Sequence, residues 1–181
     1  MPRLFIALHL SESVKKSLLR LKMTIPTARW SDESQFHLTL RFLGDVDTSK
    51  VSKLESALAK IQAIPFEMAL KGVGCFPENI KKPTRVLWAG LSAPKALYDL
   101  QKMVELECIG TGFGEQDKPF NPHITLARLK TETPLQGVEL FLKNHAEYET
   151  ELFRVTEFVL IESQLHPQGA RYSDLKQFRL G

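Results

Sequence analysis

Two tetrapeptides of one pattern carry the residue types that acid–base chemistry requires. HLTL begins at His37, and HITL begins at His123. A histidine can give or accept a proton near neutral pH, and a threonine hydroxyl can donate a hydrogen bond to an anionic oxygen. Facing each other, the two sets would place an acid, a base and two hydroxyl donors around a single phosphate.

Each tetrapeptide has the alternation of a half-buried strand. Side chains at positions i and i+2 of a strand share a face, so His37 projects with Thr39, and His123 with Thr125. The intervening apolar residues should enter the core. The simpler alternative is two ordinary strands with polar outer faces; the repeat of the whole pattern favours a shared site.

The surrounding elements repeat in the same order. Strands are predicted at 3–8, 37–44, 65–76, 85–91, 120–129, 152–163 and 170–180. Helices are predicted after Ser11, from Asp47 or Thr48, after Ser92, and over 134–146. We therefore expect a single α+β domain over 1–181 with an internal duplication, in approximate units 1–76 and 85–181. Each of two pseudo-symmetric lobes should be a mostly antiparallel sheet with outer helices, the active-site groove should lie between them, and 77–84 should be the hinge.

Composition sets broad limits on the function. The chain has 181 residues, 43% of them hydrophobic, and a net charge of +3, which permits a nucleic-acid partner without requiring one. Cys75 and Cys108 form no disulfide framework or C-x-x-C pair, so they are predicted to be free thiols in a reduced cytoplasm. No signal peptide or membrane span is predicted. The paired motifs lack metal-ligand spacing, so neither a metal nor a cofactor is expected.

These motifs resemble those of the two-histidine phosphoesterases, and within them the bacterial and archaeal RNA 2′,3′-cyclic phosphodiesterases, long labelled 2′-5′ RNA ligases. The resemblance covers nearly the whole chain, through RLFIAL, HLTLRFLG, RVLWAGL, NPHITLAR and the late GARYSDL. It implies a metal-independent phosphoric diester hydrolase that opens a terminal 2′,3′-cyclic phosphate of RNA to a 2′-phosphate. It also implies that His37 is the proton donor and His123 the proton acceptor; the residues alone do not separate the two roles.

Further residues are weaker candidates for contacts with the substrate. By the resemblance, Arg128 would approach the phosphate; the alternative is an ordinary surface arginine after a strand. Phe42 would stack on a base or belong to the core. Tyr172 would line the groove or pack at its rim. Lys81 and Lys82 would meet the RNA backbone or form a solvated loop. His9, His145 and His166 are expected to be structural, and the cysteines are not expected to be nucleophiles.

Two other functions use the same residues. The reverse reaction would join a 2′,3′-cyclic end to a 5′-hydroxyl as a 2′-5′ ligase, by microscopic reversibility. A non-catalytic module would bind RNA ends without turnover, although binding alone does not require two matched titratable pairs. The expected partner is an RNA or nucleotide with a 2′,3′-cyclic phosphate end, and the expected state is a monomer.

Overall fold

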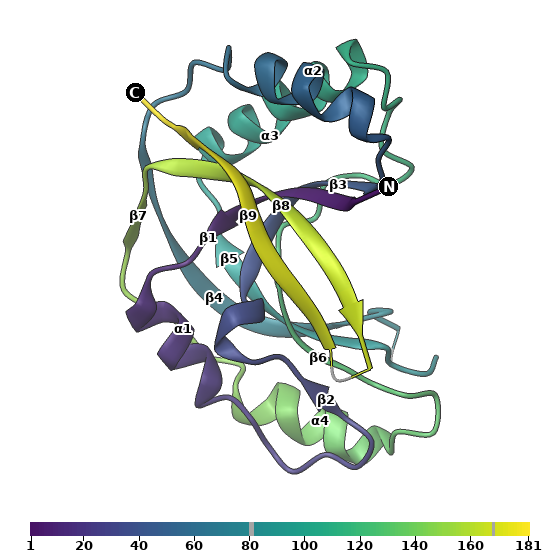
Figure 1. The fold of residues 1–181 in the computed structure, drawn as a ribbon. Helices are drawn as coiled ribbons and strands as arrows, with labels where there is room; N and C mark the ends of the chain where they lie inside the picture. The colour runs from purple at the N-terminus through teal and green to yellow at the C-terminus, as the bar shows by residue number, and fades with distance from the viewer. Residues whose placement is uncertain (80–81, 168) are drawn as a thin grey trace.

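The fold consists of two antiparallel sheets with helices at both ends (Figure 1). The computed structural model describes residues 1–79, 82–167 and 169–181. The four-stranded sheet has the order β3 (His37–Asp45), β1 (Arg3–His9), β8 (Glu157–His166), β9 (Gly169–Arg179). The five-stranded sheet has the order β2 (Arg29–Trp30), β6 (Ile124–Arg128), β5 (Val86–Ser92), β4 (Phe66–Phe76), β7 (Phe153–Val155). The predicted α+β class is confirmed.

Of the four α-helices in the described residues, two begin at side-chain caps, and the other two begin after prolines, Pro94 and Pro134. The helices are α1 (Glu12–Leu19), α2 (Thr48–Leu58), α3 (Lys95–Gly110) and α4 (Leu135–Asn144), with a 3₁₀ turn η1 (Glu33–Gln35). The side chains of Ser11 and Asp47 accept hydrogen bonds from the first turns of α1 and α2, which satisfies donors that a helix leaves unpaired. In Figure 1, α2 and α3 lie together at one end of the molecule, and α1 and α4 lie at the other.

The third strand of each sequence unit lies in the sheet that holds the first two strands of the other unit. Each sequence unit reads strand–helix–strand–helix–strand, but β4 of the first unit pairs with β5 of the second, and β8 of the second pairs with β1 of the first. The sheets therefore do not coincide with the units 1–76 and 85–181, and the duplication itself stays a prediction. The hinge prediction for 77–84 is wrong, because Phe76 pairs with Val86 and the segment joins two strands of one sheet. Ile80 and Lys81 lie outside the described residues.

The predicted strand at 152–163 is in fact two strands in different sheets. It divides at Thr156, with β7 pairing to β4 and β8 pairing to β1. No glycine, proline or other turn signal marks Thr156, so the division was not visible in the sequence. The short strand β2, which extends the five-stranded sheet beside β6, was also missed, because two residues carry no periodic signal.

Alternation along β1 separates two hydrophobic clusters. Leu4, Ile6 and Leu8 enter the large core, whereas Phe5 and Ala7 form a small cluster with Val159, Ile161 and the ring of Tyr172. The small cluster lies on the face of the four-stranded sheet that carries the first histidine motif. None of the helices in the described part of the chain is long and apolar enough to cross a membrane.

Candidate active site

The two motif histidines are held in the same way by backbone carbonyls. Nδ1 of His37 lies 2.8 Å from the carbonyl oxygen of Gln35, and Nδ1 of His123 lies 2.7 Å from that of Asn121. A carbonyl oxygen only accepts, so each Nδ1 carries the proton and donates it. Nε2 is therefore the nitrogen of each ring that is left to exchange protons with a substrate.

A capped 3₁₀ turn precedes His37, whereas the segment before His123 belongs to no helix or strand. η1 ends at Gln35 and is capped by Asp32, whose side chain accepts from the Ser34 backbone N–H, while the Gln35 side chain accepts from the backbone N–H of Asp32. The chain then enters β3 at His37. His123 precedes the first residue of β6, so the prediction that this histidine lies within the strand is wrong by one position.

Aromatic rings cover both imidazoles. The His37 ring centroid lies 4.7 Å from that of Phe5 and 5.1 Å from that of Tyr172, which meets it edge-on. The His123 ring centroid lies 4.9 Å from that of Phe76, again edge-on. Rings that exclude water from an imidazole disfavour its charged form.

This burial favours the neutral form of both histidines in the free protein. Burial lowers the pKa of His37 from 6.5 to about 4; the Gln35 carbonyl raises this pKa, and the charges of His9, His123 and Arg128 lower it. Burial also lowers the pKa of His123; the Asn121 carbonyl raises it and Arg128 lowers it. Both rings are therefore mainly neutral near pH 7, and an anionic phosphate between them would favour protonation of one.

A register shift in β6 turns Arg128 to the same face as Thr125. Thr125 pairs with Trp88 and Arg128 pairs with Val86. β6 therefore advances three residues over the length in which β5 advances two. Trp88 and Val86 share a face because they are two residues apart, and their partners therefore share it too. Strict alternation would have placed Arg128 on the opposite face.

The same shift occurs in β3. Thr39 pairs with Ala7 and Phe42 with Phe5, again three steps against two. Phe42 and Arg128, each five positions after a motif histidine, thus occupy equivalent places on the two sheets. Each shift brings the fifth residue onto the side of its motif threonine.

The two site faces come together between the sheets. β3 and β6 are in contact, and the charges of His123 and Arg128 both act on His37. Burial raises the pKa of Tyr172; the charge of Arg128 opposes this rise, and the charge of Asp32 adds to it. The structure therefore brings His37, His123, Arg128 and Tyr172 within electrostatic range of one another, with Thr39 and Thr125 half-buried on the same faces.

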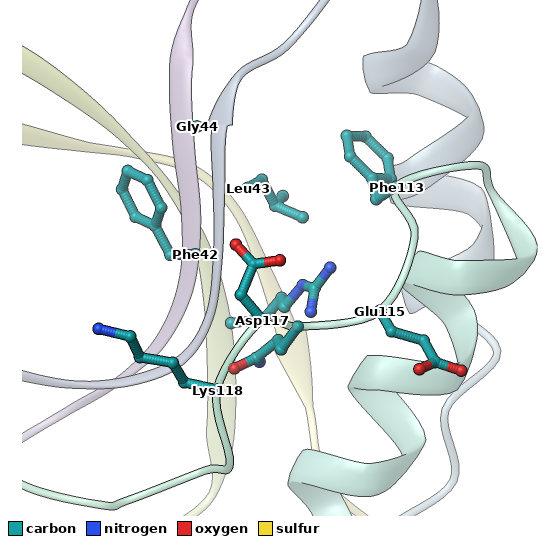
Figure 2. Close-up of a pocket in the computed structure, with 9 residues that line it drawn as sticks. Phe42, Leu43, Gly44, Phe113, Glu115, Asp117 and Lys118 are labelled. Atoms are coloured by element: carbon teal, nitrogen blue, oxygen red, sulfur yellow. The ribbon is translucent and has the colours of Figure 1, made fainter.

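Phe42 lies toward the other end of β3. Its side chain is 51% exposed, so the alternative that it belongs to the core is wrong, and the guanidinium of Arg3 lies 5.0 Å from its ring centroid. It lines a pocket of about 440 Å³ between β3 and the chain after α3, where Phe42 and Leu43 point to opposite sides of the strand (Figure 2). The other lining residues are Arg41, Gly44, Phe113, Glu115, Gln116, Asp117 and Lys118. Contact of Phe42 with a base stays a prediction.

The remaining candidates lie outside this constellation. Lys82 is exposed, and Lys81 lies outside the described residues. Cys75 and Cys108 are buried free thiols, and burial raises the pKa of each, that of Cys108 to about 12. His145 packs against Phe141, and His166 is exposed.

The structure adds residues that the sequence did not single out. Phe5 and Phe76 read as ordinary core aromatics, and no residue type marks the two carbonyl acceptors. His9 pairs in register with His37, which places it beside the site. Its Nε2 lies 2.9 Å from Asp174 Oδ2, a contact that fits the structural role expected for it. Only the packing of distant strands could have revealed this contact.

No metal-ligand set is visible in the part of the chain that the structure describes. Within the described residues, the two motifs included, no group of three or more His, Cys, Asp or Glu side chains lies close enough together to hold a metal ion. The chemistry available from these residues is proton transfer by two imidazoles and hydrogen bonding by two hydroxyls.

Comparison with known proteins agrees over nearly the full length. The family model described as LigT like Phosphoesterase matches residues 8–88 and 90–172. Proteins named RNA 2′,3′-cyclic phosphodiesterase from Methanothermobacter thermautotrophicus and Archaeoglobus fulgidus are 29% and 32% identical to the chain. The first alignment covers 98% of both chains; the second covers 97% of this chain and 99% of the relative.

Solved structures show the same fold. A structure titled as a phosphoesterase superposes with a TM-score of 0.80 at 27% identity, and E. coli LigT complexed with 3′-AMP superposes with a TM-score of 0.78 at 26% identity. Each match covers 99% of this chain and 98% of the other. Together with the paired histidine motifs and the shared two-sheet fold, these matches show that the chain belongs to the LigT-like phosphoesterase family.

Proposed function

We propose that the chain is an RNA 2′,3′-cyclic phosphodiesterase that opens a terminal cyclic phosphate to a 2′-phosphomonoester. The observation that carries the proposal is the matched pair of imidazoles, each with Nδ1–H bound to a carbonyl and Nε2 left for proton transfer. The names of the relatives from M. thermautotrophicus and A. fulgidus support the substrate class.

The reaction requires two proton transfers at one phosphorus. His123 Nε2 removes a proton from water as the water oxygen bonds to phosphorus, and protonated His37 Nε2 delivers a proton to the departing 3′ oxygen as its bond to phosphorus breaks. The hydroxyls of Thr39 and Thr125 donate to the non-bridging oxygens, and Arg128 offsets their negative charge. A donor on one face and an acceptor on the other suit an in-line displacement.

The substrate must raise the pKa of the donor. The free protein holds His37 mainly neutral, with a pKa of about 4, and the negative phosphate favours its protonated form when bound. All these residues come from one chain, so the proposed site is complete in a monomer.

Single substitutions of the two histidines test the proposal. With adenosine 2′,3′-cyclic phosphate as substrate, His37→Ala and His123→Ala should each lower turnover by about 10²–10⁴-fold, as expected for the loss of a general acid or base. His166→Ala, which removes an exposed histidine from the end of β8, is the matched control and should retain wild-type turnover. Circular dichroism should show all three variants folded.

Product analysis tests which bond breaks. Chromatographic separation of the 2′- and 3′-monophosphates should show the 2′ product alone. Wild-type turnover in either motif variant, or release of the 3′ product, would contradict the assigned roles.

A further inference from the structure

Two arginines face each other across the edge of the five-stranded sheet. Arg29 of β2 is the register partner of Arg128 of β6. Like charges placed directly opposite each other in an antiparallel pair destabilise it. Neither arginine forms an ion pair with any carboxylate in the described ranges of the chain, so the repulsion has no internal compensation.

The direction of Arg29 follows from its neighbour in the strand. Trp30 packs against Phe141 in the large core, with ring centroids 5.7 Å apart. Successive side chains of a strand point to opposite faces, so Arg29 points away from this core, to the face that carries Arg128. That face belongs to the site, because the charge of Arg128 acts on both motif histidines.

The guanidinium of Arg29 is held where the two sheets meet. Its Nη2 donates to the Pro167 carbonyl, 3.4 Å away, in the turn between β8 and β9 (Figure 1). A Cβ on Gly169 would lie 2.9 Å from the same Nη2, which shows how closely the turn packs against it. The Gln35 side chain also donates to the hairpin of β8 and β9, with its Nε2 2.9 Å from the Ala170 carbonyl oxygen. One nitrogen of Arg29 is thus anchored, and other N–H groups remain for a ligand.

The acidic side chain nearest to Arg29 in the sequence does not neutralise the two arginines. Asp32, three residues after Arg29, keeps its negative charge, but its Oδ1 caps η1 by accepting from the backbone N–H of Ser34 at 3.0 Å and from its hydroxyl at 2.5 Å. Among the described residues, it forms no ion pair with either arginine. The exposed side chains of Arg29 and Arg128 therefore form a site for negative charge beside the catalytic groups.

We propose that Arg29 binds the phosphate of the nucleotide that precedes the terminal one, and so makes the protein prefer an RNA oligonucleotide to a mononucleotide. Adjacent strands lie about 5 Å apart, so the side chains of Arg128 and Arg29 start from neighbouring positions on one face of the sheet. Successive phosphates of one RNA strand match such a pair, and the guanidinium fork suits phosphate oxygens. This inference rests on the proposed function, which concerns only the terminal cyclic phosphate.

The test compares two substrates that share the reacting group. One is adenosine 2′,3′-cyclic phosphate, and the other is a short oligoadenylate with the same cyclic end. The wild-type protein should show a higher kcat/KM for the oligonucleotide. Arg29→Gln should reduce the ratio of the two kcat/KM values by about tenfold or more, as expected for the loss of one hydrogen-bonded contact to a charged group. The loss should appear in KM, because the contact is the same in the ground state and the transition state.

Salt dependence and a matched arginine provide the controls. For the oligonucleotide, Arg29→Gln should reduce the slope of log(1/KM) against log[salt] by about 0.7, the contribution of one contact to a single strand. Arg154→Gln removes an exposed arginine from β7, at the opposite edge of the same sheet, and should retain the wild-type ratio and slope.

Three results would overturn the inference. They are a wild-type protein with no preference for the oligonucleotide, an Arg29→Gln variant with an unchanged ratio, and an Arg154→Gln variant with the same loss. Failure of the proposed function would look different, because the wild-type protein would then open neither substrate.

Discussion

Removing the aromatic cover of His37 should make this histidine easier to protonate. Two rings lie against its imidazole, those of Phe5 and Tyr172, with centroids 4.7 Å and 5.1 Å away. Burial is the largest cause of its lowered pKa. Tyr172→Ala opens one side of the imidazole to water, so the pKa of His37 should rise toward 6.5. Tyr172→Phe keeps the ring and is the matched control.

The size of the effect follows from the pKa. A value of about 4 in place of 6.5 corresponds to a preference of about 3 kcal/mol for the neutral ring. If the two rings contribute about equally to the burial, Tyr172→Ala should remove roughly half of this preference, about 1.5 kcal/mol. At a given pH above the titration, the protonated fraction of His37 should then rise roughly tenfold.

The same shift makes stability depend on pH, with a definite sign. Between pH 6.5 and about 4 the unfolded chain binds a proton at position 37 that the folded chain does not bind. The free energy of unfolding should therefore fall as the pH decreases through this range, by up to about 3 kcal/mol from His37 alone. Tyr172→Ala should reduce this loss by about half, and Tyr172→Phe should preserve it.

Titration by nuclear magnetic resonance measures the pKa directly. The Cε1–H signal of His37, assigned by its absence in His37→Gln, is followed from pH 3 to 8 in each variant. Urea unfolding at several pH values measures the stability. A His37 pKa that stays at about 4 in Tyr172→Ala, or that rises equally in Tyr172→Phe, would refute burial by this ring as the cause.

Two further substitutions test the packing that supports the site. A Cβ on Gly74 would lie 2.1 Å from the Trp88 ring, so Gly74→Ala should lower the free energy of unfolding in urea by about 1–3 kcal/mol; a loss within error would show that the ring can move aside. Arg41 is only 4% exposed, and its Nη1 donates to the two carboxylate oxygens of Glu105 at 2.7 and 2.8 Å. Glu105→Ala leaves this buried guanidinium without its carboxylate and should lower the free energy of unfolding by about 3–5 kcal/mol in the same measurement. Asp99→Ala, which breaks an exposed ion pair on the same helix, should cost about 1 kcal/mol or less, and equal losses in these two variants would contradict the role of burial.

Much of the secondary structure could be predicted because its signals are local. Apolar periodicity located α1, α2 and α3, and the capping side chains of Ser11 and Asp47 marked the starts of α1 and α2. The alternation in HLTL and HITL identified which side chains share a face. The exchange of β4 and β8 between the sheets had no local signal, because a strand's own sequence does not name its partner.

The sequence by itself determined the chemical groups of the site: two histidines and two threonines, in equal spacing on two strands. Tertiary structure alone decided how these groups behave. The register shifts that turn Phe42 and Arg128 toward their motifs depend on pairing with β1 and β5, because strict alternation alone would place both residues on the opposite face. The lowered pKa of His37 likewise depends on Phe5 and Tyr172, which lie far apart in the chain. Residue types and periodicity are properties of short segments, whereas register and burial arise only when distant segments pack together.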